Sequence, residues 1–198
     1  MSVDASCKGK VIIISGPSGA GKSTVVRRLL DRCPLPLRLS VSATTRAARP
    51  SEQNGVQYHF LSHDEFARLR AENKFLECKE VFGRGDWYGT LRSEVTSGLA
   101  EGKCVVLEID VEGTLAVLEE FPEAVTIFLH PGSMDELERR LRGRATDSEA
   151  SILRRLEVAR REMSMKTRYQ FEVVNGDMDH AVQDIINLLT RLGAEKEC

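Results

Sequence analysis

The chain has 198 residues, a formal net charge of −2 and an isoelectric point near 6.1. A chain of this length buries about 70% of its unfolded surface, which is enough for one core with small insertions. The balanced charge excludes a polycation built to hold nucleic acid, so any binding of phosphate groups must be local.

Cysteine usage and hydropathy indicate the compartment. The five cysteines are scattered, odd in number and without C-x-x-C spacing, which argues against a disulfide framework or a zinc site. No apolar run approaches the ~20 residues that cross a bilayer, and residues 1–10 lack the layout of a signal peptide. We therefore expect a cytoplasmic protein with no membrane partner.

The first element of the chain leads into a glycine-rich loop. Residues 11–15 form a β-branched apolar run typical of a strand buried on both faces, and residues 23–30 begin a helical pattern. Between them, GPSGAGKS at residues 16–23 fits the pattern G-x-x-x-x-G-K-[ST]. The glycines allow backbone N–H groups to turn towards phosphate oxygens at the positive end of the helix. We expect Lys22 to reach the β- and γ-phosphates of a nucleotide and Ser23 to ligate Mg²⁺.

About ninety residues with a different sequence pattern follow before the next long strand. Residues 58–61 and 75–82 have the character of strands, and residues 62–72 that of a short helix. Ser62 and Glu65 form a capping box, and Phe66 and Leu69 give the helix an apolar face. This segment is predicted to be a small α+β lobe.

Three further β-branched runs occur at residues 104–109, 125–129 and 171–174, each followed by a helical segment. The alternation predicts a three-layer α/β fold with a parallel central sheet covered by helices on both faces. Glu108 and Asp110 end the first of these runs, where ligands collect in open α/β sheets. One of these carboxylates is expected to order Mg²⁺ through its water shell.

Residues 133–168 form a helical, arginine-rich insert that Gly143 interrupts, and nine of the chain's twenty arginines lie there. Acid–base pairs with helical spacing are expected at Glu138–Arg142, Glu157–Arg161 and Glu162–Lys166. Arg140, Arg144 and Arg155 stand outside these pairs, and we assign them to phosphates, which the guanidinium fork matches. A flap that carries arginines and excludes water suits phosphoryl transfer. A solvated helix face is the alternative for any one of these arginines.

The segment from Thr44 to Phe60 carries a longer motif. It resembles the guanylate kinase signature T-[ST]-R-x-x-[KR]-x-x-[DE]-x-x-G-x-x-Y-x-F at every fixed position. Two arginines three residues apart can both reach one phosphate, and a nearby tyrosine hydroxyl can donate a further hydrogen bond. Together with the glycine loop, Glu77, residues 88–90, residues 108–110 and Asn175, the resemblance covers nearly the whole chain.

The resemblance implies one domain over residues 1–198 with a P-loop NTPase fold. Its core would be residues 1–39, 93–132 and 169–198, its GMP-binding lobe residues 40–92, and its lid residues 133–168. The implied reaction transfers the γ-phosphoryl group of ATP to GMP, and to dGMP, giving ADP and GDP with Mg²⁺ in guanine nucleotide metabolism. The sequence leaves the oligomeric state open.

The resemblance also implies roles for individual residues. The ATP-binding set is Gly16, Pro17, Ser18, Gly19, Ala20, Gly21, Lys22, Ser23, Thr24 and Asn175. The set that holds the GMP phosphate is Ser42, Arg46, Arg49, Tyr58 and Tyr88, and the set near the guanine is Glu77, Thr90, Glu108 and Asp110. The catalytic set is Lys22, Arg46, Arg140, Arg144 and Arg155. Guanine presents N1–H and a 2-amino group on one edge, so a carboxylate accepts from both, whereas adenine is repelled.

Two departures from the family pattern stand out. Glu108 replaces the first aspartate of the usual Asp-x-Asp, which puts its contact geometry in question. The stretch between Glu77 and Tyr88 is two residues longer than the common form, and we place the extra length in a hairpin turn around residues 83–86. Trp87 lies beside this turn, and packing of the small lobe is favoured over ligand contact.

Two other functions are considered. A guanylate-kinase-like module that binds peptides would typically lack the lysine of the glycine loop, which is present here as Lys22. A P-loop kinase for another acceptor, such as AMP or a small metabolite, is disfavoured by Glu77 and the complete signature. The four histidines have no metal-ligand spacing and are interpreted as bystanders.

Overall fold

The computed structural model describes residues 9–81, 85–143 and 148–194. Its central sheet has five strands, all parallel to their neighbours. Their order across the sheet is β2 (Leu37–Leu39), β7 (Cys104–Glu108), β1 (Val11–Ser15), β8 (Val125–His130) and β9 (Phe171–Val174). The predicted parallel sheet is confirmed, and the three-residue β2 is an addition to the strands expected from sequence.

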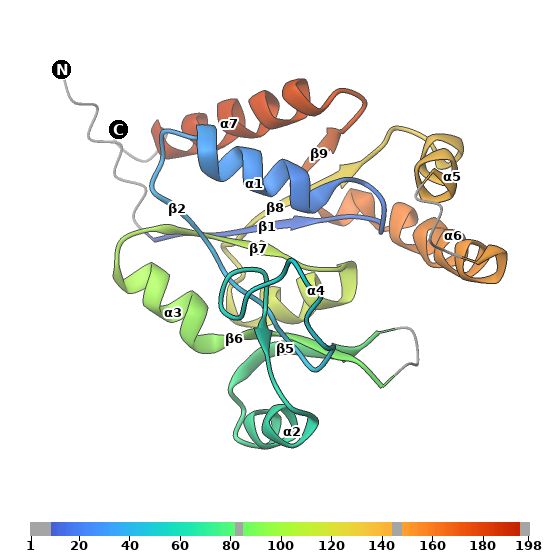
Figure 1. The fold of residues 1–198 in the computed structure, drawn as a ribbon. Helices are drawn as coiled ribbons and strands as arrows, with labels where there is room; N and C mark the ends of the chain where they lie inside the picture. The colour runs from blue at the N-terminus through green and yellow to red at the C-terminus, as the bar shows by residue number, and fades with distance from the viewer. Residues whose placement is uncertain (1–8, 82–84, 144–147, 195–198) are drawn as a thin grey trace.

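Helices cover both faces of this sheet (Figure 1). On one face lie α1 (Lys22–Arg32) and α7 (Met178–Ala194), and on the other lie α3 (Arg92–Ala100) and α4 (Val111–Glu120). The side chains of β1 alternate between the two layers: Ile12 and Ile14 join one buried cluster, and Val11 and Ile13 join the other. This two-sided burial explains the uninterrupted apolar run, since neither face of the strand meets water.

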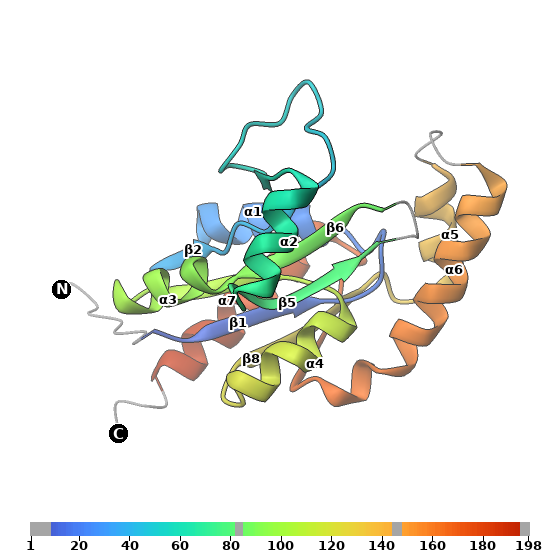
Figure 2. The ribbon, with the colours of Figure 1, turned by 90° about the horizontal axis from the view of Figure 1, so that it is seen from below.

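A second sheet of four short strands forms the small lobe. Its order is β4 (His59–Phe60), β3 (Ala43–Thr44), β6 (Trp87–Leu91) and β5 (Phe75–Glu80), and α2 (His63–Ala71) packs beside β5. The hydroxyl of Ser62 accepts a hydrogen bond from the Glu65 N–H at 3.1 Å, so the predicted cap is present. The loop between β3 and β4 projects from the body of the molecule (Figure 2).

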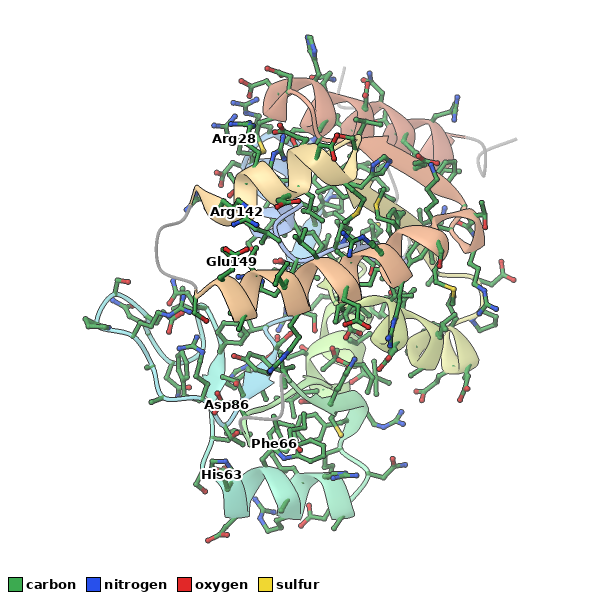
Figure 3. All side chains as sticks on the ribbon, turned by 90° about the vertical axis from the view of Figure 1, so that its right-hand side faces the viewer. Arg28, His63, Phe66, Asp86, Arg142 and Glu149 are labelled. Carbon is green, nitrogen blue, oxygen red and sulfur yellow. The ribbon has the colours of Figure 1, made fainter. Side chains whose placement is uncertain are left out.

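Aromatic side chains hold the small lobe together. Phe66 of α2 is 2% exposed and stacks on Phe75 of β5 with ring centroids 4.4 Å apart. Figure 3 shows Phe66 between α2 and the small sheet. Trp87 lies 6.1 Å from the Phe66 ring, and the guanidinium of Arg70 lies 4.4 Å from the Trp87 ring centroid. Trp87 therefore has the packing role that the sequence favoured.

The arginine-rich insert folds into α5 (Met134–Arg142), α6 (Glu149–Ser164) and the short 3₁₀ helix η1 (Lys166–Arg168). The end of α5 immediately before Gly143 is the expected interruption. Leu137 and Leu141 of α5 share a buried cluster with Ile152 and Leu156 of α6. The guanidinium of Arg142 also joins the helices through two hydrogen bonds of 2.6 and 2.8 Å to Glu149 (Figure 3).

The expected acid–base pairs of the insert form in two cases of three. Glu138 pairs with Arg142 at 2.8 Å, and Glu157 pairs with Arg161 at 2.7 Å. The predicted Glu162–Lys166 pair is wrong, because Lys166 binds Glu172 of β9 at 2.7 Å instead. The helix ends at Ser164, so the helical i, i+4 spacing no longer applies across this pair.

Three remaining expectations concern membranes, metals and cysteines. Within residues 9–81, 85–143 and 148–194, no helix is long and apolar enough to cross a membrane. The same residues contain no group of three or more His, Cys, Asp or Glu side chains that could hold a metal ion. Cys33 and Cys78 are free thiols, whereas Cys104 is disulfide-bonded, a bond that the sequence did not predict.

Candidate active site

The glycine loop joins β1 to α1 at the centre of the parallel sheet. Gly16 has a φ of +136°, and a Cβ there would lie 2.0 Å from the Leu129 carbonyl oxygen of β8, so only glycine fits this close approach. The Lys22 ammonium donates to the Gly16 carbonyl at 2.6 Å and to the Pro17 carbonyl at 3.2 Å. These bonds hold the lysine over the loop that is expected to bind phosphates.

Asn175 supports the glycine loop from the end of β9. It is 1% exposed, and its side-chain amide donates to the Ala20 carbonyl at 2.7 Å. A Cβ on Gly21, whose φ is +92°, would lie 2.6 Å from the same amide nitrogen. The Asn175 side chain thus fixes the loop in this structure, and its contact with adenine stays a prediction.

The carboxyl end of β7 supplies two carboxylates to the site. The Ser23 hydroxyl donates to Glu108 Oε1 at 2.6 Å, which places the two expected magnesium-side oxygens together. Asp110, two residues further on, begins α4 and accepts from the Gly113 N–H at 2.7 Å. The longer side chain of Glu108 therefore reaches the first turn of α1, while Asp110 lies on the α4 side.

On the small lobe, the Arg46 guanidinium is held by two side chains of the same lobe. Its Nε donates to the Tyr88 hydroxyl at 3.1 Å, and its Nη2 donates to Glu52 Oε1 at 2.9 Å. The other oxygen of Glu52 accepts from the Arg49 N–H at 2.8 Å. Glu52 occupies the [DE] position of the signature, for which no role was predicted, and it contacts both the Arg46 guanidinium and the Arg49 backbone.

Tyr58 completes this group of polar side chains. Its ring lies edge-on to Tyr88 with centroids 5.7 Å apart, and the guanidinium of Arg46 lies 5.5 Å from its centroid. Burial raises the pKa of the Tyr58 hydroxyl, so it remains a hydrogen-bond donor near neutral pH. The Ser42 carbonyl accepts from the His59 N–H at 2.9 Å, which ties the start of β3 to β4.

Glu77 of β5 is a mostly buried carboxylate. Its Oε1 accepts from the hydroxyl of Thr90, a residue only 1% exposed, at 2.6 Å. A Cβ on Gly113 would lie 3.2 Å from Glu77 Oε2 and 3.3 Å from Asp110 Oδ1, so the two carboxylates converge on this glycine. Burial raises the pKa of Glu77, the Thr90 hydrogen bond lowers it, and the charge of Asp110 raises it further.

The lid brings one of its predicted arginines directly to the glycine loop. Arg155 of α6 donates from Nη2 to the Ser18 hydroxyl at 2.7 Å. Arg140 of α5 donates to Glu136 Oε1 and to the Asn175 carbonyl, each at 2.7 Å, so it lies next to the loop support. Arg144 lies outside the described residues, and its role stays a prediction.

Glu162 of α6 is a further residue of interest, to which the sequence assigned only an ion pair with Lys166. Burial raises the pKa of its carboxyl to about 7, while the charge of Lys22 lowers it and that of Asp110 raises it. Its expected partner Lys166 binds Glu172 instead. A sequence signal was available, because Ile152, Leu156 and Ala159 mark the buried face of α6 and position 162 continues it.

A parallel sheet with a lysine- and serine-bearing glycine loop at its central strand defines an α/β protein of the P-loop kinase class. The protein-family model described as guanylate kinase matches residues 8–192. A guanylate kinase of Rhodopirellula baltica is 58% identical over 182 residues, which are 91% of this chain and 87% of that protein. A guanylate kinase of Trichormus variabilis is 47% identical over 177 residues, covering 89% of this chain and 87% of that protein.

A solved structure agrees with these relatives. The crystal structure of guanylate kinase from Anaplasma phagocytophilum matches with a TM-score of 0.75 and 34% sequence identity, covering 94% of this chain and 87% of that one. The chain belongs to the guanylate kinase family.

Proposed function

We propose that this protein transfers the γ-phosphoryl group of ATP to GMP, and to dGMP, giving ADP and GDP or dGDP. The observation that carries the proposal is the arrangement at the end of β7. Glu108 contacts Ser23 of the glycine loop, and Asp110, two residues later, lies beside Glu77 of the small lobe at Gly113. A donor half and an acceptor half thus meet at one strand end, as a reaction between two nucleotides requires.

The acceptor half suits a nucleoside monophosphate with a guanine base. Arg46, Arg49, Tyr58 and Tyr88, with Ser42 nearby, would hold the phosphate. Glu77, with Thr90 fixing one of its oxygens, would accept from N1–H and the 2-amino group of guanine. Adenine presents an unprotonated N1 to the same carboxylate and is rejected.

The donor half supplies charge stabilisation and positioning. The backbone of residues 16–24 would cradle the phosphates of ATP, with Lys22 reaching the transferred group and Arg140, Arg144 and Arg155 of the lid adding positive charge. The phosphate oxygen of GMP is already a nucleophile, so no protein base is needed. Exclusion of water by the lid favours transfer to GMP over hydrolysis.

Mg²⁺ fits the residues present at the donor half. The Ser23 hydroxyl and the Glu108 carboxylate are hard oxygen donors that lie together. Asp110, two residues after Glu108, would contact the ion through a water molecule. Bound there, Mg²⁺ would neutralise charge on the phosphate oxygens of ATP. We place the reaction in guanine nucleotide metabolism in the cytoplasm, within a single domain divided as the sequence suggests.

Product analysis tests the proposal. The purified protein is incubated with ATP, Mg²⁺ and GMP, and nucleotides are separated by chromatography. We expect ADP and GDP to form in equal amounts, and ADP formation to stop when GMP is omitted. Formation of ADP without GDP, or no turnover at all, would overturn the proposed function.

A further inference from the structure

Lys79 is a charged residue at the acceptor half to which neither the signature nor the proposed reaction assigns a role. It follows Glu77 by two residues on β5, so both side chains point to the same face of the strand. Its ammonium lies 3.2 Å from Asp110 Oδ2 and 2.6 Å from Glu112 Oε2. One lysine of the small lobe therefore bridges to the first turn of α4.

The surroundings of Lys79 are strongly acidic. Glu77 and Asp110 converge on Gly113, and Glu112 follows in α4. The charge of Asp110 raises the pKa of Glu77, and the positive charge of Lys79 lowers the pKa values of both Glu77 and Glu162. Lys79 thus offsets a repulsion that would otherwise push these carboxylates apart or protonate them.

Two hydrogen bonds orient the Asp110 carboxylate, and one of them comes from Lys79. Its Oδ1 accepts from the Gly113 N–H, and its Oδ2 accepts from Lys79. With both oxygens held, the carboxylate has one orientation beside Glu77. An acceptor site whose carboxylates are already oriented avoids the ordering cost that binding otherwise includes.

We propose that Lys79 is a positioning residue for recognition of the acceptor base: its ammonium fixes the Asp110 carboxylate beside Glu77 in the arrangement that guanine binds. The inference rests on the proposed function, since it takes a guanine nucleotide as the ligand of these carboxylates. Lys79 itself need not touch the base. Removing its charge should therefore weaken the affinity for GMP and leave the rate of the chemical step unchanged.

The stability of the fold is expected to be insensitive to this lysine. The side chains of Lys79 and Asp110 are 43% and 39% exposed, and that of Glu112 is 74% exposed. Ion pairs at such exposure contribute about 0–1 kcal/mol to folding. Loss of GMP affinity without loss of stability would therefore separate positioning from a merely structural role.

Three variants test the inference. Lys79→Met removes the charge and keeps the length, Lys79→Arg keeps the charge, and Lys103→Met is the matched control. Lys103 pairs with Glu101 at 2.8 Å with both side chains 42% exposed, and it directly precedes β7, at the opposite end of that strand from Glu108. Binding of GMP is measured by isothermal titration calorimetry, kcat and the KM for each substrate by a coupled assay, and folding by thermal denaturation.

We expect Lys79→Met to raise the Kd and KM for GMP about fivefold or more, with kcat and the KM for ATP within about twofold of wild type. Lys79→Arg should restore GMP binding to within about twofold, and Lys103→Met should leave it unchanged. The inference is overturned if Lys79→Met binds GMP like wild type, or if Lys103→Met weakens binding equally. A wild-type protein that binds GMP but does not phosphorylate it would overturn the proposed function and leave the positioning role to be judged by calorimetry alone.

Discussion

At the scale of single residues, the side chains that we propose to bind substrate have hydrogen-bonding partners within the protein. Arg46 binds Tyr88 and Glu52, Glu77 binds Thr90, and Ser23 binds Glu108. Such contacts fix rotamers before substrate arrives, which lowers the ordering cost of binding. The partners of Lys22 are of another kind, because its ammonium donates to backbone carbonyl oxygens of the loop that is expected to bind phosphates.

Replacing Lys22 tests its part in the reaction. Lys22→Met should lower kcat about 100- to 1,000-fold, since one positively charged donor to the transferring group is lost. The variant should unfold at a temperature close to that of the wild type, as its side chain makes no contribution to the buried clusters of the core. Turnover is measured by the coupled assay, and wild-type activity in the variant would remove Lys22 from the mechanism.

The raised pKa of Glu162 predicts that the free energy of unfolding depends on pH. Its folded pKa of about 7 lies above the ordinary value of 4.5, so the folded chain binds more protons than the unfolded chain between these values. The free energy of unfolding should therefore fall as pH rises through this window, by about 3 kcal/mol at most and by less where water reaches the carboxylate.

The variant Glu162→Gln isolates this effect. It should be more stable than wild type by about 1–2 kcal/mol at pH near 8 and about equal to it at pH near 4. Urea denaturation at both pH values measures the difference. An advantage of the same size at both pH values would show that ionisation of Glu162 is not its cause.

At the scale of elements, packing of α2 on β5 stabilises the small lobe. Phe66→Ala should destabilise the protein by about 3–5 kcal/mol, because a fully buried ring is lost and a cavity remains. The KM for GMP should rise more than the KM for ATP, since Glu77 and Thr90 lie on the strands of this lobe. Thermal denaturation and steady-state kinetics check both effects, with Val56→Ala, exposed by 54% in the same lobe, as the control. Equal effects of the two variants would contradict this view of the lobe.

The sequence predicted elements well where their patterns are long. The strands expected at 11–15, 104–109, 125–129 and 171–174 and the capped helix α2 are present to within one residue at either end of each strand, because each strand is a run of β-branched apolar residues and the helix has a recognisable cap. The strands β2 and β3 have three and two residues, too few to show a period. The Glu162–Lys166 prediction failed because spacing along the chain does not reveal where a helix ends.

The sequence indicated some residues of the candidate site and not others. The signature located Arg46, Arg49 and Tyr58 because the motif places them in one loop. The sequence did not predict the contacts of Glu52 across that loop or of Lys79 between β5 and α4, nor the raised pKa of Glu162. Such contacts arise from the tertiary arrangement, which a single sequence does not encode in any fixed spacing.

At the scale of the whole molecule, the central sheet positions three parts around one strand end. In the proposed reaction the glycine loop and the arginine-rich insert would form the donor half, and the small lobe would form the acceptor half. The strand β7 ends between them, with Glu108 on one side and Asp110 on the other. Substrate choice should therefore be decided by the small lobe, while the glycine loop sets the type of chemistry.

The most direct measurement is the acceptor preference of the purified protein. A coupled assay with ATP and Mg²⁺ compares kcat/KM for GMP, dGMP, AMP and UMP. We expect GMP to be the best acceptor, with dGMP next and AMP and UMP lower by a factor of about 1,000 or more, because only guanine offers both N1–H and a 2-amino group to the Glu77 carboxylate. A value of kcat/KM for AMP or UMP close to that for GMP would contradict it.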